Sequence, residues 1–320
     1  MSTQPALPVP VVALAGGVGA ARFLRGLTRA VPAGLVTAIV NTGDDKSFYG
    51  VKVCPDLDIV TYTLGGRIEP TRGWGLAGDR FDLIETLAGL GHDTWFRLGD
   101  LDYAVCLHRT LRLREGAGLA SVADELRRFF GVATRLLPMS EDDCPTLVSR
   151  RGGAVVHFEE YLVRDGAPDD VAGVDLSAAR RAKPAPGVLE SLRAASAILL
   201  CPSNPVVSIG PILAVPGIRE ALRASGAPVV AVSPIVGGAP IKGPADRLLR
   251  GLGIEVSARG VAELYRDVVQ GFVLDLRDAA LEQDVRALGL RTLVTDTIMR
   301  DDAHAARLAQ AALTLAARMP

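Results

Sequence analysis

The sequence predicts an α/β protein: a Rossmann-like, doubly wound and mainly parallel sheet with an added helical insertion. The first observation is an apolar, β-branched run at 9–14 that leads directly into a glycine-rich turn. Apolar residues at helical spacing over 20–30 follow the turn, and a second apolar run covers 35–40. Strand, glycine turn, helix and strand in this order form the opening unit of a parallel sheet.

The second observation is a comparable block late in the chain. Apolar runs at 197–200, 228–232 and 272–274 have the length and composition of buried strands. A helix is expected at 212–224, although Pro216-Gly217 interrupts the pattern near its start, and an amphipathic helix is expected at 303–317. The same kind of unit therefore occurs at both ends of the chain.

The middle of the chain is more mixed, and neither a repeat nor a low-complexity linker divides it. We therefore expect one interrupted domain over 1–320, with a nucleotide-binding core at about 9–64 and 195–300 and an inserted segment at about 65–190. Within the insertion the pattern predicts helices at 79–90 and 119–130, and strands at 134–137, near 148 and at 155–158.

Composition excludes several classes of function. The 320 residues carry 35 basic and 36 acidic side chains, and only 5% are aromatic, so neither global attraction to nucleic acid nor a stacking surface for it is expected. No apolar run approaches the ~18 residues that span a bilayer. The first ten residues lack the pattern of a secretory signal, so a cytoplasmic protein is expected. The four cysteines never form Cys-x-x-Cys, which disfavours a zinc or disulfide framework.

The glycine turn Gly16-Gly17-Val18-Gly19 is suited to a phosphate group. Small residues allow close approach of the backbone, and a helix N-terminus favours anions. The dinucleotide fingerprint is incomplete, because its third glycine would fall at Arg22 and the second strand ends in Asn41 instead of an acidic residue. The P-loop pattern is absent as well. The alternative is a glycine turn needed only for tight packing of strand and helix.

Four carboxylates fall within fifteen positions, in segments that look like turns. Asp44 and Asp45 follow the second strand, at the edge where open α/β sheets bind ligands, and Asp56 and Asp58 come shortly after. Mg²⁺ usually takes one or two carboxylates and completes its shell with phosphates and water, so a metal–phosphate site is one interpretation. The other is that these residues are caps and turns, which aspartate favours anyway.

Other loops offer contacts for a phosphorylated small molecule. Ser203 and Asn204 end a buried strand and are placed to contact a base or sugar, and Lys242 is placed to bind a phosphate. Trp74 lies in a glycine-rich segment that could form a flap with a stacking surface, and Arg97 belongs to a loop at 97–102. The four histidines share no metal spacing, and Gly-x-Ser-x-Gly is absent. These loops support metal-assisted transfer more readily than covalent catalysis.

An ordered set of motifs resembles the 2-phospholactate transferase family (CofD/FbiA) over about 15–265. The motifs are Ala-Gly-Gly-Val-Gly-Ala-Ala-Arg at 15–22, Asn-Thr-Gly-Asp-Asp at 41–45, Cys-Pro-Asp-Leu-Asp at 54–58, Gly-Trp-Gly at 73–75, Trp-Phe-x-Leu-Gly-Asp at 95–100, Pro-Ser-Asn-Pro-Val-Val-Ser at 202–208, Ser-Pro-Ile-Val-Gly at 233–237 and Lys-Gly-Pro-Ala at 242–245. The order of the set makes it specific, whereas the glycine loop alone would not be.

The resemblance implies an enzyme of coenzyme F-420 biosynthesis, cytoplasmic and homodimeric. Such enzymes transfer a phospho-lactyl or phospho-enolpyruvyl group from a guanosine diphosphate-activated donor to the deazaflavin Fo, releasing GMP, with Mg²⁺. It places Asp58 and Arg97 at the acceptor, to which we add Trp74. We assign Gly16, Gly17, Gly19, Arg22, Ser203, Asn204 and Lys242 to the donor, and Asp44, Asp45 and Asp56 to catalysis and the metal.

Two departures from the family pattern stand near the acceptor side. The family commonly reads Gly-Asp-Arg-Asp followed by Thr-His, where this chain has Leu101 and Val105-Cys106, a change that could alter donor preference or rate. One alternative function is a non-enzymatic regulator that binds a nucleotide sugar, as in the gluconeogenesis-factor branch of the same superfamily. An unrelated Rossmann dehydrogenase is the other, and the incomplete fingerprint disfavours it.

Overall fold

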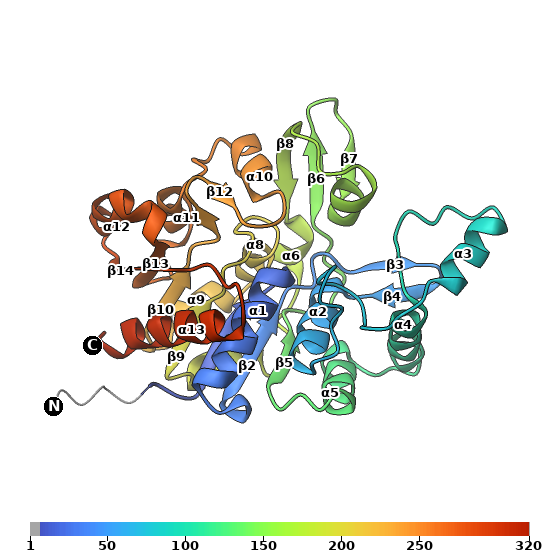
Figure 1. Cartoon of the computed structure of the whole chain (residues 1–320), viewed down its shortest axis with the longest axis horizontal. Helices are drawn as coiled ribbons and strands as arrows, with labels where there is room; N and C mark the ends of the chain where they lie inside the picture. The colour runs from blue at the N-terminus through green and yellow to red at the C-terminus, as the bar shows by residue number, and fades with distance from the viewer. Residues whose placement is uncertain (1–6, 320) are drawn as a thin grey trace.

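The computed structural model describes residues 7–319, so residues 1–6, where no secretory signal is expected, lie outside the described part. Seven parallel strands form the central sheet (Figure 1). In spatial order they are β14 (Arg291–Thr295), β13 (Gly271–Asp275), β10 (Val229–Val232), β9 (Ala197–Leu200), β1 (Val11–Ala15), β2 (Val36–Val40) and β5 (Arg135–Pro138). The predicted Rossmann-like α/β class is confirmed.

The first strand lies inside the sheet because it is apolar on both faces, as a buried parallel strand must be. All five residues of β1 are buried, and they alternate between two separate hydrophobic clusters. Val12 and Leu14 contact one layer of helices, whereas Val11, Ala13 and Ala15 contact the other. Helices therefore cover both faces of the sheet.

One helical layer holds the glycine-loop helix and its neighbours, and the other holds most of the shorter helices of the second half (Figure 1). The first layer consists of α1 (Gly17–Ala30), α2 (Pro55–Leu64), α5 (Leu119–Phe129) and α13 (Asp302–Ala317). The second consists of α6 (Ser177–Arg181), α7 (Val188–Ala194), α8 (Ile209–Ala214), α9 (Ile218–Ala224), α10 (Ala245–Gly251), α11 (Ala258–Tyr265) and α12 (Glu282–Ala287).

Smaller elements project beyond the central sheet (Figure 1). A three-stranded antiparallel sheet contains β7 (Val155–His157), β6 (Leu147–Arg150) and β8 (Val171–Asp175). The remaining elements are the hairpins β3 (Lys46–Phe48) with β4 (Val51–Val53) and β11 (Ile235–Val236) with β12 (Ala239–Pro240), and the helices α3 (Asp82–Gly89) and α4 (Asp100–Arg114). The segment 65–190 thus contains strands as well as helices, and its strand β5 belongs to the central sheet.

Three local expectations need correction. The helix predicted at 212–224 is two helices, α8 and α9, because Pro216-Gly217 separates them and Gly217 has a φ of +89°. Cys54-Pro55-Asp56-Leu57-Asp58 is no turn, since Pro55 starts α2 and places both aspartates in its first turn. The loop predicted at 97–102 ends at Gly99, because α4 begins at Asp100.

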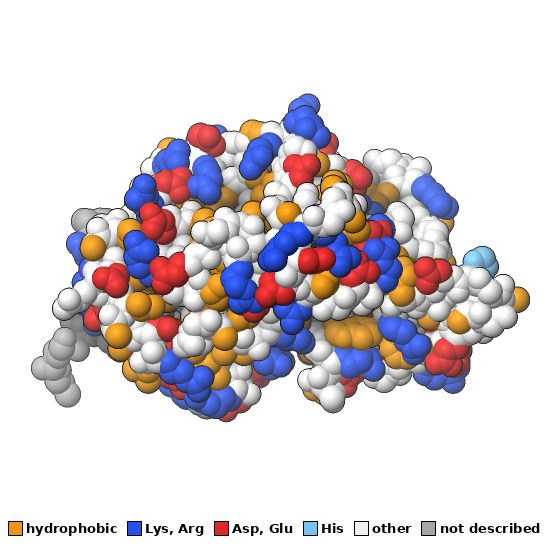
Figure 2. Space-filling view, turned by 90° about the horizontal axis from the view of Figure 1, so that it is seen from above, with side chains coloured by type: hydrophobic (Ala, Val, Ile, Leu, Met, Phe, Trp, Pro, Cys, Tyr) orange, Lys and Arg blue, Asp and Glu red, His pale blue; other side chains and the backbone are white. Residues whose placement is uncertain are grey.

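Within residues 7–319, no helix is long and apolar enough to cross a membrane. Seen from above, basic and acidic side chains alternate over the visible face instead of forming one field of a single sign (Figure 2). That pattern agrees with the near balance of charge in the sequence.

Candidate active site

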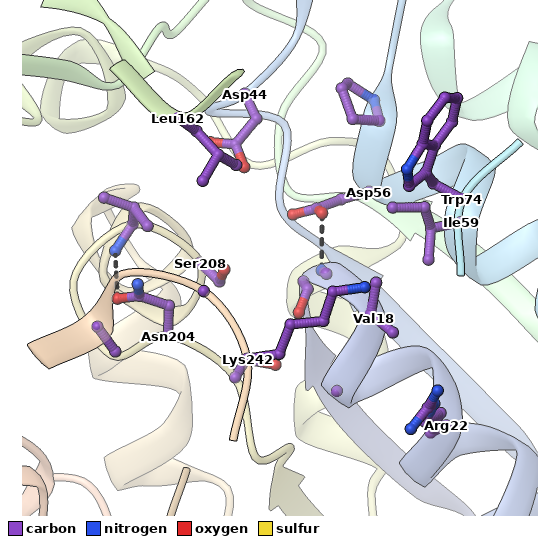
Figure 3. Close-up of a pocket in the computed structure, with 18 of the residues that line it drawn as sticks. Val18, Arg22, Asp44, Asp56, Ile59, Trp74, Leu162, Asn204, Ser208 and Lys242 are labelled. Atoms are coloured by element: carbon purple, nitrogen blue, oxygen red, sulfur yellow. Dashed lines mark hydrogen bonds between the residues drawn. The ribbon is translucent and has the colours of Figure 1, made fainter. Parts of the chain in front are cut away.

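A cavity of about 740 Å³ lies beside the glycine loop and the carboxyl ends of β1, β9 and β10 (Figure 3). Its wall combines residues from the core with residues from the insertion and from the loop 297–300 after β14. Of the residues assigned from the sequence, twelve line it: Gly16, Gly17, Gly19, Arg22, Asp44, Asp56, Asp58, Trp74, Arg97, Ser203, Asn204 and Lys242. Asp45 is the assigned residue that does not line this cavity.

Asp56 shapes the glycine loop directly. Its Oδ1 accepts a hydrogen bond from the Gly17 N–H at 2.7 Å (Figure 3), and its Oδ2 accepts one from Nδ2 of Asn41 at 2.9 Å. Burial raises the pKa of Asp56 to about 6, although the bonds from Asn41 and Gly17 oppose the rise. One carboxylate thus connects the first turns of α1 and α2 and the end of β2.

Two of the loop glycines are required by close packing. A Cβ on Gly16 would lie 2.7 Å from Oδ2 of Asp56, and one on Gly19 would lie 2.5 Å from the carbonyl oxygen of Pro202. Gly17 has a φ of +72°, a conformation that side chains other than glycine rarely adopt. The packing interpretation of this turn therefore holds for Gly16 and Gly19, and the same close approach brings the loop to the edge of the cavity.

Three buried carboxylates gather on one side of the cavity: Asp44, Asp56 and Glu159. Burial raises the pKa of Glu159 to about 8, and the charges of Asp56 and Asp45 add to the effect. Burial is also the main cause that raises the pKa of Asp44, and the charges of Asp56 and Glu159 raise it further. Oδ1 of Asp44 is buried and has no hydrogen-bond partner among the described residues.

This donor set fits a hard cation. Carboxylate oxygens are the ligands Mg²⁺ prefers, and one or two of them suffice beside substrate phosphates. A cation would also offset the mutual repulsion that adds to burial in raising the pKa values of Asp44 and Glu159. Asp44, with its unpartnered oxygen, and Glu159 are the best placed to provide ligands. Asp56 is the less available, because both of its oxygens already accept hydrogen bonds.

Asp45 points elsewhere although it follows Asp44 directly. Burial raises its pKa to about 7, and the charges of Lys52 and Arg109 and a hydrogen bond with Cys54 oppose the rise. It is 5% exposed and lies behind the wall of the cavity. The structure therefore brings Asp44 and Asp56 to the cavity and leaves Asp45 among the residues that support the hairpin β3–β4.

Two cations face the opposite side of the glycine loop. Arg22 lies one turn into α1, and Lys242 reaches toward the loop from beyond β12 (Figure 3). Burial lowers the pKa of Lys242, and the charge of Arg22 lowers it further. An anion between the two side chains would remove this repulsion, so the arrangement suits a phosphate group.

Ser203 and Asn204 are fixed by the backbone around them. The Ser203 hydroxyl donates to the carbonyl oxygen of Gly16 at 2.8 Å, which holds the loop after β9 against the glycine loop. Oδ1 of Asn204 accepts from the N–H groups of Val206 and Val207 at 3.0 and 3.3 Å (Figure 3). These bonds leave Nδ2 of Asn204 as the group of this side chain that can donate a hydrogen bond to a ligand.

Aromatic and guanidinium groups alternate along the insertion side of the cavity. The guanidinium carbon of Arg72 lies 5.0 Å from the ring centre of Trp74 and 5.3 Å from that of Phe81. The guanidinium carbon of Arg97 lies 4.6 Å from the centre of the same Phe81 ring. Lys242 donates to the carbonyl oxygen of Arg72 at 3.2 Å and so connects this segment to the core. Through Arg72 and Phe81 these contacts connect Trp74 and Arg97, both assigned to the acceptor.

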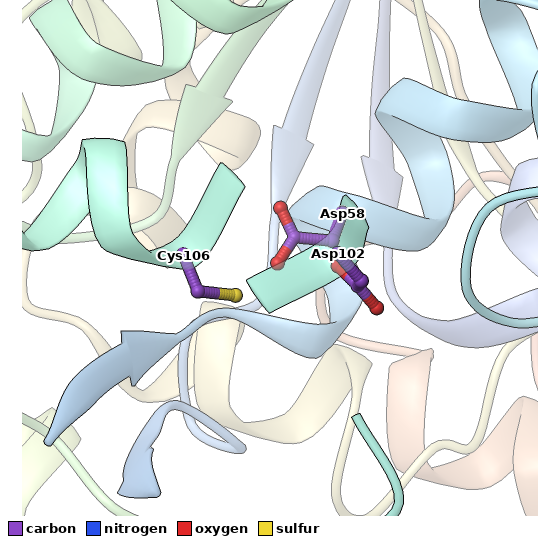
Figure 4. Close-up of side chains that lie close together, drawn as sticks. All are labelled: Asp58, Asp102 and Cys106. Atoms are coloured by element: carbon purple, nitrogen blue, oxygen red, sulfur yellow. The ribbon is translucent and has the colours of Figure 1, made fainter. Parts of the chain in front are cut away.

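Asp58 belongs to a buried polar cluster beneath the same side. Arg109, only 1% exposed, forms an ion pair with Oδ1 of Asp58. The Tyr62 hydroxyl donates to Oδ1 of Asp102 at 2.6 Å, and ligand atoms of Asp58, Asp102 and Cys106 lie within 4.8 Å of one another (Figure 4). Burial raises the pKa of Asp102 to about 7, with the charge of Asp58 as the next cause.

The two departures from the family pattern fall in different places. Leu101 is 47% exposed and does not line the cavity. Cys106 is buried beside Asp58, and its sulfur lies 3.6 Å from Nη1 of Arg109. His108 faces outward and contacts Glu125 at 3.3 Å, so it does not take the place of a histidine at position 106.

Several residues of the site were missed at the level of sequence. Glu159 follows β7, far from any motif, and no local signal marks it. Arg109 lies within a helix whose charged residues look like a solvated face. Asp102 had a usable signal, because it lies two residues after the motif that ends at Asp100, whereas Phe81 lies six residues beyond Gly75 and outside any motif.

Comparisons with known proteins identify the family of this chain. The family model described as 2-phospho-L-lactate transferase CofD matches residues 11–309. A phosphoenolpyruvate transferase from Kitasatospora aureofaciens is 47% identical over 313 residues, which cover 96% of this chain and 97% of that protein. A 2-phospho-L-lactate transferase from Methanosarcina mazei is 38% identical over 300 residues, 94% of this chain and 98% of that protein.

Among solved structures, a UPF0052-family protein from Bacillus halodurans has a TM-score of 0.65 at 22% identity, covering 95% of this chain and 98% of its own. At this identity the likeness concerns the fold. The family model matches nearly the whole chain, and both relatives align with it almost from end to end. The chain therefore belongs to the 2-phospho-L-lactate transferase (CofD) family.

Proposed function

We propose that this protein transfers a phospho-lactyl or phospho-enolpyruvyl group from a guanosine diphosphate-activated donor to the deazaflavin Fo in coenzyme F-420 biosynthesis, and that GMP is released. The observation that carries the proposal is the shared cavity. It brings the glycine loop, the carboxylates Asp44 and Glu159, and the acceptor residues Asp58 and Arg97 together in a chain of this family.

The donor occupies the core side of the cavity. Its diphosphate lies at the glycine loop between Arg22 and Lys242, where the backbone N–H groups and two cations offset its charge. Ser203 and Asn204 border the nucleoside part, together with the loop 297–300. The acceptor enters from the insertion side, where Trp74 offers a stacking surface and Asp58 and Arg97 contact its polar groups.

Mg²⁺ is the cofactor of this proposal, held by Asp44 and Glu159 next to the donor phosphates. When bound it neutralises phosphate charge and polarises the reacting phosphorus. The side chains of this protein position donor and acceptor. Transfer of this kind depends on positioning and charge neutralisation more than on a covalent nucleophile.

An enolpyruvyl donor is the favoured substrate of the two. Relatives named phosphoenolpyruvate transferase share more of this sequence than the relative named 2-phospho-L-lactate transferase does. We also propose that the protein is a cytoplasmic homodimer, as the sequence resemblance suggests.

One assay tests the reaction. The protein is incubated with Fo, Mg²⁺ and each guanosine diphosphate donor in turn, and GMP and the phosphodiester product are measured. Formation of both products with the enolpyruvyl donor, and more slowly with the lactyl donor, is expected. No turnover with any donor, together with tight binding of a UDP-sugar, would instead identify a nucleotide-sugar-binding regulator.

A further inference from the structure

Arg109 is a buried arginine beneath the side of the cavity that we assign to the acceptor, and it does not line the cavity itself. Its guanidinium forms an ion pair with Oδ1 of Asp58, donates to the carbonyl oxygen of Lys52 at 3.1 Å and contacts Sγ of Cys106 at 3.6 Å. A charged group is this deeply buried only when partners compensate for the loss of water. Arg109 is therefore held in one position from several directions.

Asp58, in contrast, lines the cavity and depends on Arg109 for its place. Its Oδ2 is buried and has no hydrogen-bond partner among the residues that the structure describes. The ion pair with Arg109 is the side-chain contact that anchors this carboxylate. A change in the guanidinium should thus move Asp58 more readily than it moves other residues of the wall.

The neighbouring carboxylate of Asp102 makes the position of Asp58 depend more strongly on Arg109. Asp102 lies within 4.8 Å of Asp58, measured between ligand atoms, and it lines the cavity as well (Figure 4). Two anions at this separation repel each other in a buried setting, and the positive charge of Arg109 offsets that repulsion. The cluster has the residue types of a metal site, but the guanidinium already contacts two of its three members, Asp58 and Cys106.

We propose that Arg109 is a positioning residue for acceptor binding: it holds Asp58 against the cavity wall and keeps Asp102 beside it, without touching the acceptor itself. The inference rests on the proposed function, because that function gives Asp58 its contact with the acceptor. It adds Arg109, from α4, to the residues that determine acceptor binding, and this residue lies outside the motifs that identify the family.

The test is the substitution Arg109→Lys. Lysine keeps the charge but lacks the planar fork that contacts Asp58, Lys52 and Cys106 together. We expect the KM for Fo to rise at least tenfold and the dissociation constant for Fo, measured by calorimetry without donor, to rise in parallel. The KM for the donor should stay within twofold, since the glycine loop is untouched.

Partial unfolding of the variant would not hide the answer. A smaller folded fraction lowers the apparent kcat and leaves both KM values unchanged, whereas lost positioning changes the KM for Fo. The matched control is Arg150→Lys, in which an arginine paired with Asp165 and Asp170 outside the cavity is changed in the same way. This control should leave both KM values within twofold.

Two results would overturn the inference, and they differ from each other. A normal KM and dissociation constant for Fo in Arg109→Lys, while Asp58→Asn weakens Fo binding, would reject the role of Arg109 and leave the proposed function standing. Unchanged Fo binding in Asp58→Asn would remove the acceptor role of Asp58 and with it the role of Arg109, whereas the proposed function itself fails only if the unchanged protein forms no product with any donor.

Discussion

Asp56 accepts a hydrogen bond from the N–H of Gly17 at 2.7 Å, so a carboxylate occupies one of the donors that the start of α1 would otherwise offer to a phosphate. The glycine loop therefore takes its shape from an anion of the protein, close to where we place the anion of the substrate. Both can be accommodated because Arg22 and Lys242 lie on the other side of the loop and because Asp44 and Glu159 are placed to hold a cation.

The first prediction concerns Asp56→Ala. The change leaves the Gly17 N–H and Nδ2 of Asn41 without their partner, and each buried donor left unsatisfied costs about 1–3 kcal/mol. We expect lower stability in urea denaturation and at least a tenfold loss of transfer rate. Asp82→Ala is the control, because Asp82 is largely exposed and pairs with exposed Arg80; it should change stability by less than about 0.5 kcal/mol. Equal stability of the two variants would contradict the structural role of Asp56.

The second prediction concerns Gly19→Ala. A Cβ here would lie 2.5 Å from the carbonyl oxygen of Pro202, so the loops after β1 and β9 must separate. Overpacking of this kind costs about 1–3 kcal/mol, and donor affinity should fall with it. In the control Gly34→Ala, nothing lies within 4 Å of the added atom. That variant should retain full stability and donor affinity in thermal unfolding and calorimetry, and a similar loss in both would reject the packing argument.

The third prediction concerns pH and metal removal. Burial raises the pKa of Glu159 to about 8 in the folded protein, from an unfolded value of about 4.5. The folded state then binds more protons than the unfolded state between these values, so the free energy of unfolding of the metal-free protein should fall as pH rises from about 4.5 to 8. Denaturation in the presence of a chelator at pH 6 and pH 8 measures this.

Glu159→Gln should remove at least about 1 kcal/mol of that pH dependence, because the amide does not titrate. Added Mg²⁺ should stabilise the unchanged protein more at pH 8 than at pH 6, since protons compete with the metal for the carboxylates. The variant should lose most of this Mg²⁺ effect. A variant that keeps the whole of both effects would exclude Glu159 as a metal ligand.

The fourth prediction concerns Phe81→Ala. The ring of Phe81 lies between the guanidinium groups of Arg72 and Arg97, so its loss frees Arg97 from the stack. The KM for Fo should rise several-fold with a smaller change in kcat. Phe129 is an aromatic residue outside the cavity and 79% exposed, and Phe129→Ala should leave both constants unchanged. Steady-state kinetics with varied Fo distinguishes the two, and parallel behaviour of the variants would reject the role of the stack.

The order of the core elements could be predicted because parallel strands buried on both faces have continuous apolar runs. The run predicted at 197–200 coincides with β9, those at 35–40 and 228–232 begin one residue before β2 and β10, and that at 272–274 is one residue shorter than β13 at each end. β14 was missed, since Arg291–Thr295 is a half-exposed edge strand with mixed polarity. The first residues of α4 are predicted as part of a loop, because the acidic residues Asp100 and Asp102 at its start resemble a turn.

The site could be predicted where its residues belong to local motifs and not where they are assembled by the fold. Asp44 and Asp45 are neighbours in the sequence, yet Asp44 faces the cavity and Asp45 faces Lys52 and Cys54. The residue gathered with Asp44 and Asp56 is instead Glu159, which the β6–β7 hairpin delivers from more than a hundred positions away. Spacing along the chain does not carry that information.

The contact between α1 and α13 bears on how the protein is made. The two helices are labelled in Figure 1. Gly26 of α1 packs against the backbone of Ala305, and Asp302 pairs with Arg25 and Arg29 of α1. The helix that begins at the glycine loop thus receives part of its support from a residue that is synthesised 273 positions after Arg29. Until β9, Pro202 and α13 have been synthesised, the glycine loop lacks these contacts, so donor binding should arise only after α13 has formed.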